Sequence, residues 1–322
     1  MVRIKDVARH AGVSTATVSR VINGIRVDEA LTENVQRSIL ELGYLPDRQA
    51  RSLRRQRSEL VALVLPDIEN PYWTAMARGV ENIAQEAGYS VVLCNTDEMP
   101  NKESTYLSIA RSEKMAGVII AAASSTPTLG RLLSDGRAVI AVDRVVDAAV
   151  DTVTSDNVGL GRHATRDLID RGYRSIACVT GPSSASTAVQ RADGWRSVMR
   201  SKKLSTKGML RHVNFRVDGG REAALDLLSA PSPPDAIVAT NNLVGVGVLQ
   251  VLNEQHTSDV GCAVIGELPF TTARTPNATI TPLHPRQMGE TAARMLLERI
   301  DGFDESPRVI VQPLNEATGH FW

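Results

Sequence analysis

Small hydroxyl side chains gather in one short segment near the start of the chain. The segment "TATVSR" offers three hydroxyls, one methyl group and one guanidinium: Thr15, Thr17, Ser19, Ala16 and Arg20. Hydroxyl and guanidinium groups donate hydrogen bonds to phosphates and base edges, and an alanine methyl fits beside a thymine methyl. The segment therefore suits close approach to a nucleic acid. The alternative interpretation is a small helical subdomain in which Ser and Thr only cap helices.

Aliphatic residues at helical spacing predict that this segment belongs to the second of three short helices. The predicted helices cover residues 4–11, 13–22 and 32–42, with Gly12 between the first two and Thr32 as the cap of the third. Two short helices joined by a glycine-containing turn match the helix-turn-helix pattern, in which the second helix enters the major groove of DNA. We therefore expect an all-α helix-turn-helix domain at the start of the chain.

The charge distribution separates this domain from the rest of the chain. The 322 residues include 36 Lys or Arg and 36 Asp or Glu, so the formal net charge is zero. Residues 1–58 nevertheless hold 11 basic against 6 acidic side chains, which leaves 25 basic against 30 acidic for residues 59–322. A basic head on an acidic body indicates that the head binds a polyanion.

Two stretches of the head resemble one family of transcription regulators. "IKDVARHAGVSTATVSRVING" is similar, nearly residue for residue, to the first two helices of the LacI/GalR (lactose-repressor) family, and "LGYLPDRQARSLR" resembles that family's third-helix end and hinge. The resemblance extends over essentially the whole chain. It implies that Thr15 and Ala16 read bases, with Arg20 on the same helix, and that Leu53 inserts into the minor groove. The DNA-binding surface that we expect also includes Thr17, Ser19, Asn23, Ala50 and Arg54.

Residues 47–58 form the candidate hinge between the head, residues 1–46, and the body, residues 59–322. In "DRQARSLRRQR", five arginines accompany a single acid, and Ala50 and Leu53 are the only apolar pair. One such pair is too little to hold an isolated helix together in water, so a flexible charged linker is one interpretation. In the other, the segment folds over DNA phosphates beside a second copy, with Leu53 wedged between base steps. Asp47 stands where the family more often has Asn, which adds a negative charge near DNA.

Short aliphatic runs alternate with helical stretches in the body. They predict strands at residues 60–65, 90–94, 117–122, 138–143, 152–155, 175–180, 236–240 and 262–265. Continuous hydrophobicity is typical of strands buried on both faces, and hence of parallel sheets. A weak internal repeat, "AQEAGYSVVL" and "LIDRGYRSIACV", agrees with an α/β body of two doubly wound parallel-sheet lobes that resembles periplasmic sugar-binding proteins. The lobes are expected at about 59–159 plus 287–315 and about 160–286 plus 316–322, with chain crossings near 157–161, 284–290 and 313–318.

The resemblance also implies a small-molecule effector in the cleft between the lobes, since ligands of open α/β sheets bind at the carboxyl ends of strands. The matching positions are Tyr72, Trp73, Asp143, Arg144, Thr187, Arg191, Phe215, Asn242 and Leu268. Arg191 is the strongest candidate because an arginine fork suits hydroxyls or carboxylates. In the alternative interpretation, Tyr72 and Phe215 belong to the core and Arg191 pairs with Asp193 or Asp143.

Two departures from the family bear on the effector. Asn241-Asn242 stands where the family usually has Asn-Asp, and Gly266-Glu267-Leu268 stands where it usually has Gly-Phe-Asp. That aspartate typically accepts hydrogen bonds from sugar hydroxyls, which Leu268 cannot do. Glu267 would substitute only if the loop rotated, because neighbours along a strand point in opposite directions. A neutral sugar and a charged or less polar metabolite both stay open.

Enzyme chemistry finds little support in the sequence. "GLGRHA" at residues 159–164 fits the dinucleotide pattern G-x-G-x-x-A, but the acid expected about 20 residues later is missing. Walker A, G-x-S-x-G, H-E-x-x-H and C-x-x-C patterns do not occur, and the six histidines lack ligand spacing. We expect no enzyme, no cofactor and no metal. The rival function is a solute-binding or sugar-metabolising protein that shares the body fold.

Cysteine usage and the chain ends predict the compartment and the assembly. Cys94, Cys178 and Cys262 lie in aliphatic runs, which favours reduced core residues in a cytoplasmic protein. "MVRIKDVARH" is charged too early for a signal peptide, and no apolar run approaches the roughly 20 residues that span a bilayer. "NEATGHFW" carries no leucine heptad, so we expect a homodimer, without a tetramerising helix, on a palindromic operator of double-stranded DNA.

Overall fold

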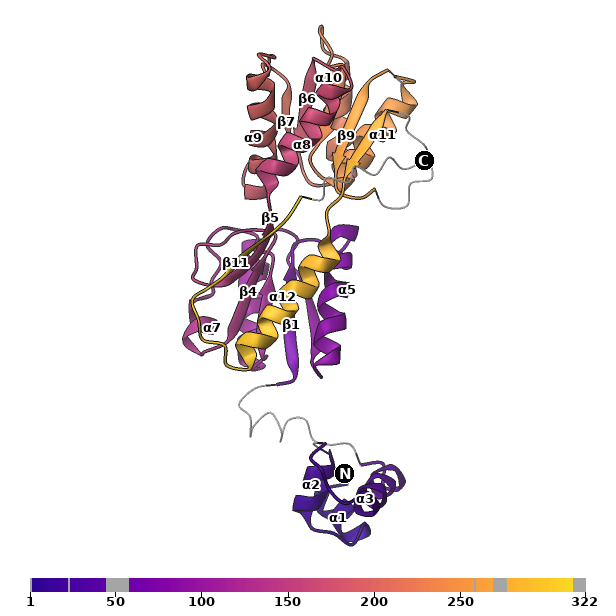
Figure 1. Cartoon of the computed structure of the whole chain (residues 1–322), viewed down its shortest axis with the longest axis vertical. Helices are drawn as coiled ribbons and strands as arrows, with labels where there is room; N and C mark the ends of the chain where they lie inside the picture. The colour runs from indigo at the N-terminus through magenta and orange to yellow at the C-terminus, as the bar shows by residue number, and fades with distance from the viewer. Residues whose placement is uncertain (1, 23, 45–57, 258, 269–276, 315–322) are drawn as a thin grey trace. The chain divides into compact units, whose positions relative to one another are not determined.

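The chain divides into two units, which we describe separately: Met1–Ser58, which holds the head and the hinge segment, and Glu59–Trp322, the body (Figure 1). The structure, a computed structural model, describes residues 2–22, 24–44, 58–257, 259–268 and 277–314.

Three helices form the head: α1 (Ile4–His10), α2 (Thr15–Ile22) and α3 (Glu29–Glu41). They pack around a small apolar cluster of Val7, Ala8, Ala11, Val18, Val35 and Tyr44. Gly12 and Gly43 adopt the left-handed backbone conformation, with φ of 65° and 59°, and end the first and third helices. The predicted helix-turn-helix arrangement is confirmed.

The start of the third helix differs from the sequence prediction. Asp28, not Thr32, caps α3, because its carboxylate accepts hydrogen bonds from the backbone N–H groups of Ala30 and Leu31 at 3.1 and 3.3 Å. Thr32 lies one turn inside the helix, where its hydroxyl donates to the Asp28 carbonyl at 2.9 Å. An aspartate satisfies free N–H groups and also suits the positive end of the helix dipole, so the helix begins earlier than the apolar pattern indicates.

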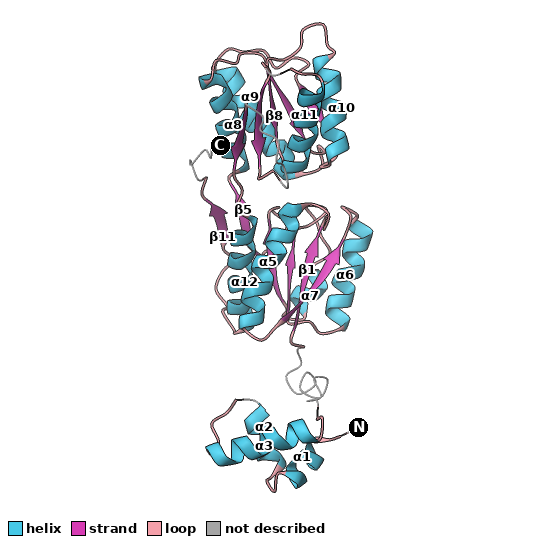
Figure 2. Ribbon diagram, turned by 90° about the vertical axis from the view of Figure 1, so that its right-hand side faces the viewer, coloured by secondary structure: helices cyan, strands magenta, loops and turns pink. Residues whose placement is uncertain are grey.

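The first sheet of the body has six parallel strands in the order β11-β5-β4-β3-β1-β2. Its strands are β1 (Leu60–Leu65), β2 (Ser90–Asn95), β3 (Gly117–Ile120), β4 (Ala138–Val142), β5 (Asp151–Ser155) and β11 (Val309–Gln312). The helices α5 (Pro71–Glu86) and α12 (Pro285–Ile300) cover one face, and α6 (Pro100–Ser112) and α7 (Gly130–Ser134) cover the other (Figure 2). We call this part the N-lobe.

The second sheet has five parallel strands in the order β10-β9-β8-β6-β7. Its strands are β6 (Ile176–Thr180), β7 (Leu210–His212), β8 (Ala236–Ala239), β9 (Gly261–Ile265) and β10 (Ala278–Thr281). The helices α8 (Asn157–Asp170) and α9 (Ser186–Ser201) cover one face, and α10 (Val217–Leu228) and α11 (Asn242–Glu254) cover the other. We call this part the C-lobe. Two doubly wound parallel sheets confirm the predicted architecture.

Three connections join the lobes. The chain leaves the N-lobe after β5, which ends at Ser155, and returns to it before α12, which begins at Pro285. After β11 it leaves again, and Leu314 packs against the C-lobe core. At each crossing the chain leaves a sheet at the carboxyl end of a strand. The carboxyl ends of the strands in the two sheets therefore face a shared space.

Glycines let paired helices cross at very short range in both lobes. A Cβ atom at Gly161 of α8 would lie 2.0 Å from the Arg191 carbonyl oxygen of α9, and one at Gly194 of α9 would lie 2.3 Å from the Val158 carbonyl of α8. Gly79 and Gly289 are related in the same reciprocal way between α5 and α12, where the corresponding distances are 2.1 and 2.2 Å. Only glycine permits such an approach, so these crossings hold the helices in fixed register.

None of the helices in the described part of the chain combines the length and apolarity needed to cross a membrane.

Candidate functional site

The exposed face of α2 is the candidate nucleic-acid interface of the head. The backbone N–H of Thr17 donates to the Ser14 hydroxyl at 3.1 Å, so Ser14 caps the helix, and the two hydroxyls lie 2.9 Å apart. Val18 is fully buried and anchors the helix on the head core, while Thr15, Ala16 and Arg20 are exposed. The structure thus leaves a small methyl and hydroxyl surface beside one guanidinium.

The remaining predicted DNA contacts differ in how they are placed. Thr17 and Ser19 are half-buried, and the Thr17 hydroxyl already contacts Ser14. Within the described residues, no carboxylate lies within 4 Å of the Arg20 guanidinium, so this side chain is available to an anion. The other predicted contacts lie outside the described residues: Asn23, Ala50, Leu53 and Arg54.

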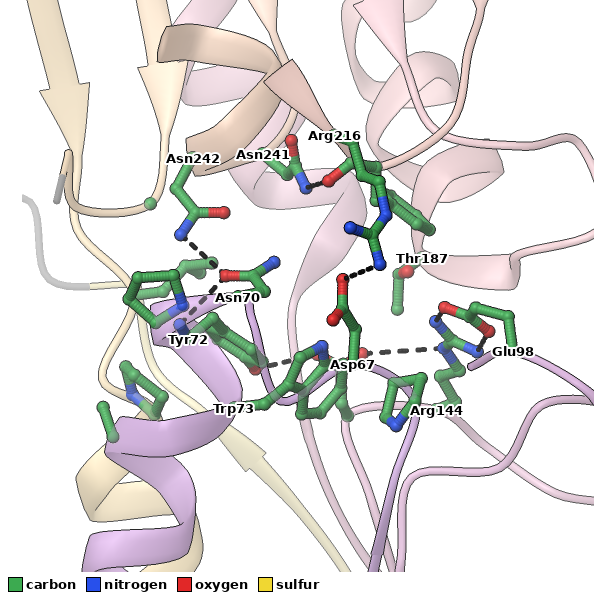
Figure 3. Close-up of a pocket in the computed structure, with 18 of the residues that line it drawn as sticks. Asp67, Asn70, Tyr72, Trp73, Glu98, Arg144, Thr187, Arg216, Asn241 and Asn242 are labelled. Carbon is green, nitrogen blue, oxygen red and sulfur yellow. Dashed lines mark hydrogen bonds and ion pairs between the residues drawn. The ribbon is translucent and has the colours of Figure 1, made fainter. Parts of the chain in front are cut away.

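A cavity of about 490 Å³ lies between the lobes of the body, at the carboxyl ends of both sheets (Figure 3). Its walls come from the segments that follow β1, β2, β4, β6, β7, β8 and β9. A volume of this order accommodates a metabolite of one or two rings. Eight of the nine predicted effector contacts line the cavity: Tyr72, Trp73, Asp143, Arg144, Thr187, Arg191, Phe215 and Asn242.

Tyr72 and Asp143 form the hydrogen-bonded centre of the N-lobe wall. The Tyr72 hydroxyl donates to Asp143 Oδ1 at 2.8 Å, and its ring meets Trp73 edge to face with centroids 4.8 Å apart. Burial, and then the neighbouring Asp143 carboxylate, raise the pKa of Tyr72 well above its ordinary value, so the hydroxyl stays a donor. Asp143 has a φ of 64°, a left-handed conformation that is costly for a residue other than glycine.

Arg144 forms a two-bond ion pair with Glu98 across the N-lobe. Its Nη1 and Nη2 atoms donate to the two Glu98 carboxylate oxygens at 2.7 and 2.6 Å, and Nη1 also donates to the Ala122 carbonyl at 2.9 Å. Burial acts to lower the pKa of the Arg144 guanidinium, but Glu98 and then Asp143 outweigh it, and the pKa lies above its ordinary value. Asp97 and Glu98 are consecutive left-handed residues, with φ of 51° and 59°.

Arg191 occupies the C-lobe wall without an ion pair. Its Nε donates to Asn157 Oδ1 at 2.9 Å and its Nη1 to the Thr240 carbonyl at 2.8 Å, and the residue is 5% exposed. Asp193 pairs instead with Arg196, and among the described residues no carboxylate lies within 4 Å of Arg191. Burial lowers the pKa of the Arg191 guanidinium, since removal from water disfavours the charged form.

Phe215 covers part of the C-lobe wall. A Cβ atom at Gly181 would lie 2.1 Å from the Phe215 ring, so the ring rests directly on the backbone after β6. Thr187 is buried in the first turn of α9 and lines the same wall (Figure 3). Aromatic faces on both lobes therefore offer apolar cover to a ligand whose polar groups face the arginines.

Polar contacts between described residues bridge the lobes at the cavity. Arg216 of the C-lobe pairs with Asp67 and Glu69 of the N-lobe at 3.2 and 2.5 Å. The Asn242 amide donates to Asn70 Oδ1 at 2.9 Å, and Asn70 also caps α5 (Figure 3). These contacts hold the lobes in the conformation that encloses the cavity.

Leu268, the ninth predicted contact, does not line the cavity. It is half-buried against the C-lobe core, while Glu267 lines the cavity in its place. The prediction for Leu268 is therefore corrected: an apolar side chain gains more from the core than from a polar cavity wall.

The segment "GLGRHA" also has a structural explanation. It lies within α8, which Asp156 caps through a 2.8 Å hydrogen bond from the Gly159 N–H. Gly161 packs against the Arg191 backbone. Gly161 therefore serves helix packing and Gly159 makes room for the Asp156 cap, and the crossing positions Arg191 at the cavity.

The sequence prediction missed several cavity residues. They are Pro66, Asp67, Asn70, Asp97, Glu98, Asn214 and Arg216, while Asn241 and Glu267, noted in the sequence as departures from the family, line the cavity as well. All but Arg216 and Asn214 come within a few residues of a predicted strand end. Inspection of every strand's carboxyl end would have identified them, whereas Asn214 and Arg216 follow β7, a strand that the aliphatic pattern did not predict.

Comparison with known proteins places both units in one group. Residues 3–47 match the family described as "Bacterial regulatory proteins, lacI family", and residues 58–318 match "Periplasmic binding proteins and sugar binding domain of LacI family". The ribose operon repressor of Escherichia coli (strain K12) is 32% identical over 93% of this chain and 93% of its own length. The solved transcriptional regulator CelR in complex with cellobiose is 29% identical with a TM-score of 0.71, covering 97% of both chains. The lac repressor dimer bound to operator and an anti-inducer has a TM-score of 0.84 at 20% identity, covering 96% of both chains, and shows a shared fold.

Proposed function

This chain belongs to the lacI family of bacterial regulatory proteins, and on that basis we propose that a small effector in the inter-lobe cavity controls its binding to DNA. The chain is a DNA-binding transcription regulator, like the relatives named as repressors and regulators that align with it over nearly its full length. The observation that carries the effector proposal is the cavity, whose polar groups come from both lobes.

The proposed DNA contacts combine the head with the hinge. Thr15, Ala16, Ser19 and Arg20 enter the major groove, and Thr17 helps to fix the start of α2 through Ser14. Leu53 is proposed as a minor-groove wedge, and Ala50 and Arg54 as neighbouring contacts. A homodimer would present two such heads to a palindromic operator, because the two-fold axes of protein and DNA then coincide.

The proposed effector is a sugar or related metabolite with several hydrogen-bonding groups. Arg191, Asn242 and Thr187 contact it from the C-lobe, Asp143 and Arg144 from the N-lobe, and Tyr72, Trp73 and Phe215 cover its apolar face. A relative named for the ribose operon and a neighbour solved with cellobiose support a carbohydrate-like ligand.

A ligand that touches both lobes couples the cavity to DNA. It changes the free energy of the arrangement held by Arg216–Asp67 and Asn242–Asn70, and the hinge segments start at the N-lobe. Such coupling is typically worth about 1–3 kcal/mol and is reciprocal, so operator DNA changes effector affinity by the same factor.

Fluorescence anisotropy with the DNA upstream of the chain's own gene tests the proposal. The full chain is expected to bind one fragment specifically, and a panel of sugars and sugar acids is expected to contain a compound that shifts that affinity by at least fivefold. Arg20→Ala should lower operator affinity by about 1–3 kcal/mol, while Arg37→Ala, an exposed arginine on α3, serves as the matched control. Failure to bind any fragment specifically would contradict the proposal.

Leu53→Ala separates the wedge from simple charge attraction. We expect a loss of about 1–3 kcal/mol on the operator and almost none on random DNA. Arg54→Ala should instead weaken both by a similar amount and lower the slope of log affinity against log salt by about one. Equal losses on both DNAs for Leu53→Ala would remove the wedge from the mechanism.

A further inference from the structure

The two cavity arginines carry information about the charge of the ligand. We infer that the effector bears an anionic group, a carboxylate or a phosphate, which pairs with Arg191 and takes the place of the Glu98 carboxylate on Arg144. This inference rests on the proposed function, in that it takes the effector to lie in the inter-lobe cavity.

Arg191 supplies the first part of the argument. A guanidinium has five N–H donors, and among the described residues only Asn157 and Thr240 accept hydrogen bonds from that of Arg191. A charge that is 5% exposed and lacks an ion pair among the described residues costs free energy that an anion would recover. The side chain lines the cavity, so a ligand can reach it.

Glu98 supplies the second part, because it is the more movable member of its ion pair. The Arg144 side chain is 8% exposed and is held independently by the Ala122 carbonyl at 2.9 Å and by Asp143 at 3.9 Å. The Glu98 side chain is 42% exposed and stands on the segment where Asp97 and Glu98 are both left-handed. Release of Glu98 to solvent therefore needs little rearrangement and leaves the Arg144 fork in place on the Ala122 carbonyl.

The charge balance of the cluster favours an exchange over an addition. Arg144 and Arg191 are balanced by Glu98 and Asp143, which also accepts from Tyr72. Of the other charged groups that line the cavity, Asp67 pairs with Arg216, Asp97 pairs with Lys102, and Glu267 is exposed. If Glu98 leaves, one positive charge is uncovered, and a ligand carboxylate or phosphate restores neutrality with the same two-bond geometry. A hydroxyl group cannot replace that ion pair, so a neutral sugar would leave Glu98 where it is.

Thermal unfolding of the full chain tests the exchange with matched probes. The probes are inorganic phosphate against chloride at equal ionic strength, D-gluconate against D-glucose, and D-ribose 5-phosphate against D-ribose. We expect saturable stabilisation by anions of one class, with the neutral twin at least tenfold weaker. The gluconate and phosphate arms distinguish a carboxylate from a phosphate ligand.

Three variants locate the effect. Glu98→Gln keeps the side-chain shape but removes the charge, so it should tighten anion binding about fivefold to tenfold. Arg191→Gln should abolish the saturable stabilisation by anions, because it removes the guanidinium that pairs with them in the cavity. Glu254→Gln is the matched control, since Glu254 forms a similar two-bond pair with Arg221 at 2.7 and 2.8 Å on the C-lobe surface, away from the cavity.

The outcomes separate this inference from the proposed function. Equal or tighter binding of the neutral twin, no anion response, or a Glu98→Gln response that equals that of Glu254→Gln would overturn the inference. Operator release by a neutral sugar would then still support the proposed function. Conversely, anion binding through Arg191 with no change in operator affinity would uphold the inference and contradict the effector's role.

Discussion

Arg144 in the N-lobe and Arg191 in the C-lobe reach the same cavity from two similar parallel sheets, yet their surroundings differ. Arg144 is part of an ion pair whose acid is half-exposed, whereas the buried Arg191 donates, within the described part of the chain, to neutral acceptors only. The residues that flank them differ as well: left-handed backbone occurs at Asp97, Glu98 and Asp143 of the N-lobe wall.

This difference indicates how the lobes share the work of recognition. The C-lobe presents a rigid donor group, fixed by the close crossing of α8 and α9 at Gly161. The N-lobe presents groups that already satisfy one another and that stand on strained backbone. A ligand would therefore dock on the C-lobe and rearrange the N-lobe, which is the lobe joined directly to the hinge.

Removal of each arginine gives the largest expected contrast. Arg191→Ala should lower the affinity for the ligand that releases the operator by about 100-fold, because a charge-assisted hydrogen bond contributes up to about 3 kcal/mol. Arg144→Ala should cost about tenfold, since Glu98 competes for the same guanidinium. Isothermal titration calorimetry measures both, with operator affinity as the control, and equal losses would remove the asymmetry between the lobes.

The glycine crossings test whether rigidity of the C-lobe matters for recognition. Gly161→Ala and Gly79→Ala each place a methyl about 2 Å from a carbonyl oxygen and should each destabilise the body by about 1–3 kcal/mol in urea unfolding. Only Gly161→Ala should also weaken ligand binding, because the oxygen in question belongs to Arg191 itself.

Gly130→Ala is the control for these substitutions. It lies at the start of α7 with no atom within 4 Å of the new methyl, so it should be neutral or stabilising by up to about 1 kcal/mol. Ligand affinity that survives Gly161→Ala unchanged would show that the position of Arg191 does not depend on the crossing.

Replacement by methionine compares the two arginines through stability alone. Arg144→Met leaves the Glu98 carboxylate and the Ala122 carbonyl without a partner, so we expect a loss of about 1–2 kcal/mol, reduced by the exposure of Glu98. Arg191→Met loses two hydrogen bonds but also removes an unpaired buried charge, so its effect should lie within about 1 kcal/mol of zero. Urea unfolding that ranks the two variants in the opposite order would contradict this account.

Regular features of the sequence predicted most of the fold. Buried strands such as β1 and β6 are continuous aliphatic runs, and their flanking helices end in glycine. The strands β7, β10 and β11 were not predicted, because each lies at an edge of its sheet. Polar or exposed residues at these edges, such as Arg211 and Val309, interrupt the aliphatic pattern.

The cavity shows the limit of the same approach. Family resemblance identified positions such as Arg191 and Phe215, but not Glu98 or Arg216, whose roles depend on contacts across 46 or more positions of sequence. Whether an arginine is paired or free is decided by tertiary packing, and one sequence does not report it. Leu268 was misplaced for the same reason, because competition between core and cavity is settled by the fold.

The pH dependence of Tyr72 offers the finest test of the N-lobe wall. The folded-state pKa of Tyr72 is raised by burial and by Asp143, so at high pH the folded state holds a proton that the unfolded state has lost. The resulting stability is complete below the unfolded pKa of about 10 and is lost as the pH rises above it, by up to about 1.4 kcal/mol per pH unit. Between pH 10 and 11 the free energy of unfolding from urea titrations should therefore fall by about 1 kcal/mol more for the wild type than for Tyr72→Phe. Burial also raises the pKa of Cys262, to about 12, and that of Cys178, so both proteins share a decline from these thiols. The difference between the two profiles isolates Tyr72, and parallel profiles would mean that the phenol is not held as a donor to Asp143.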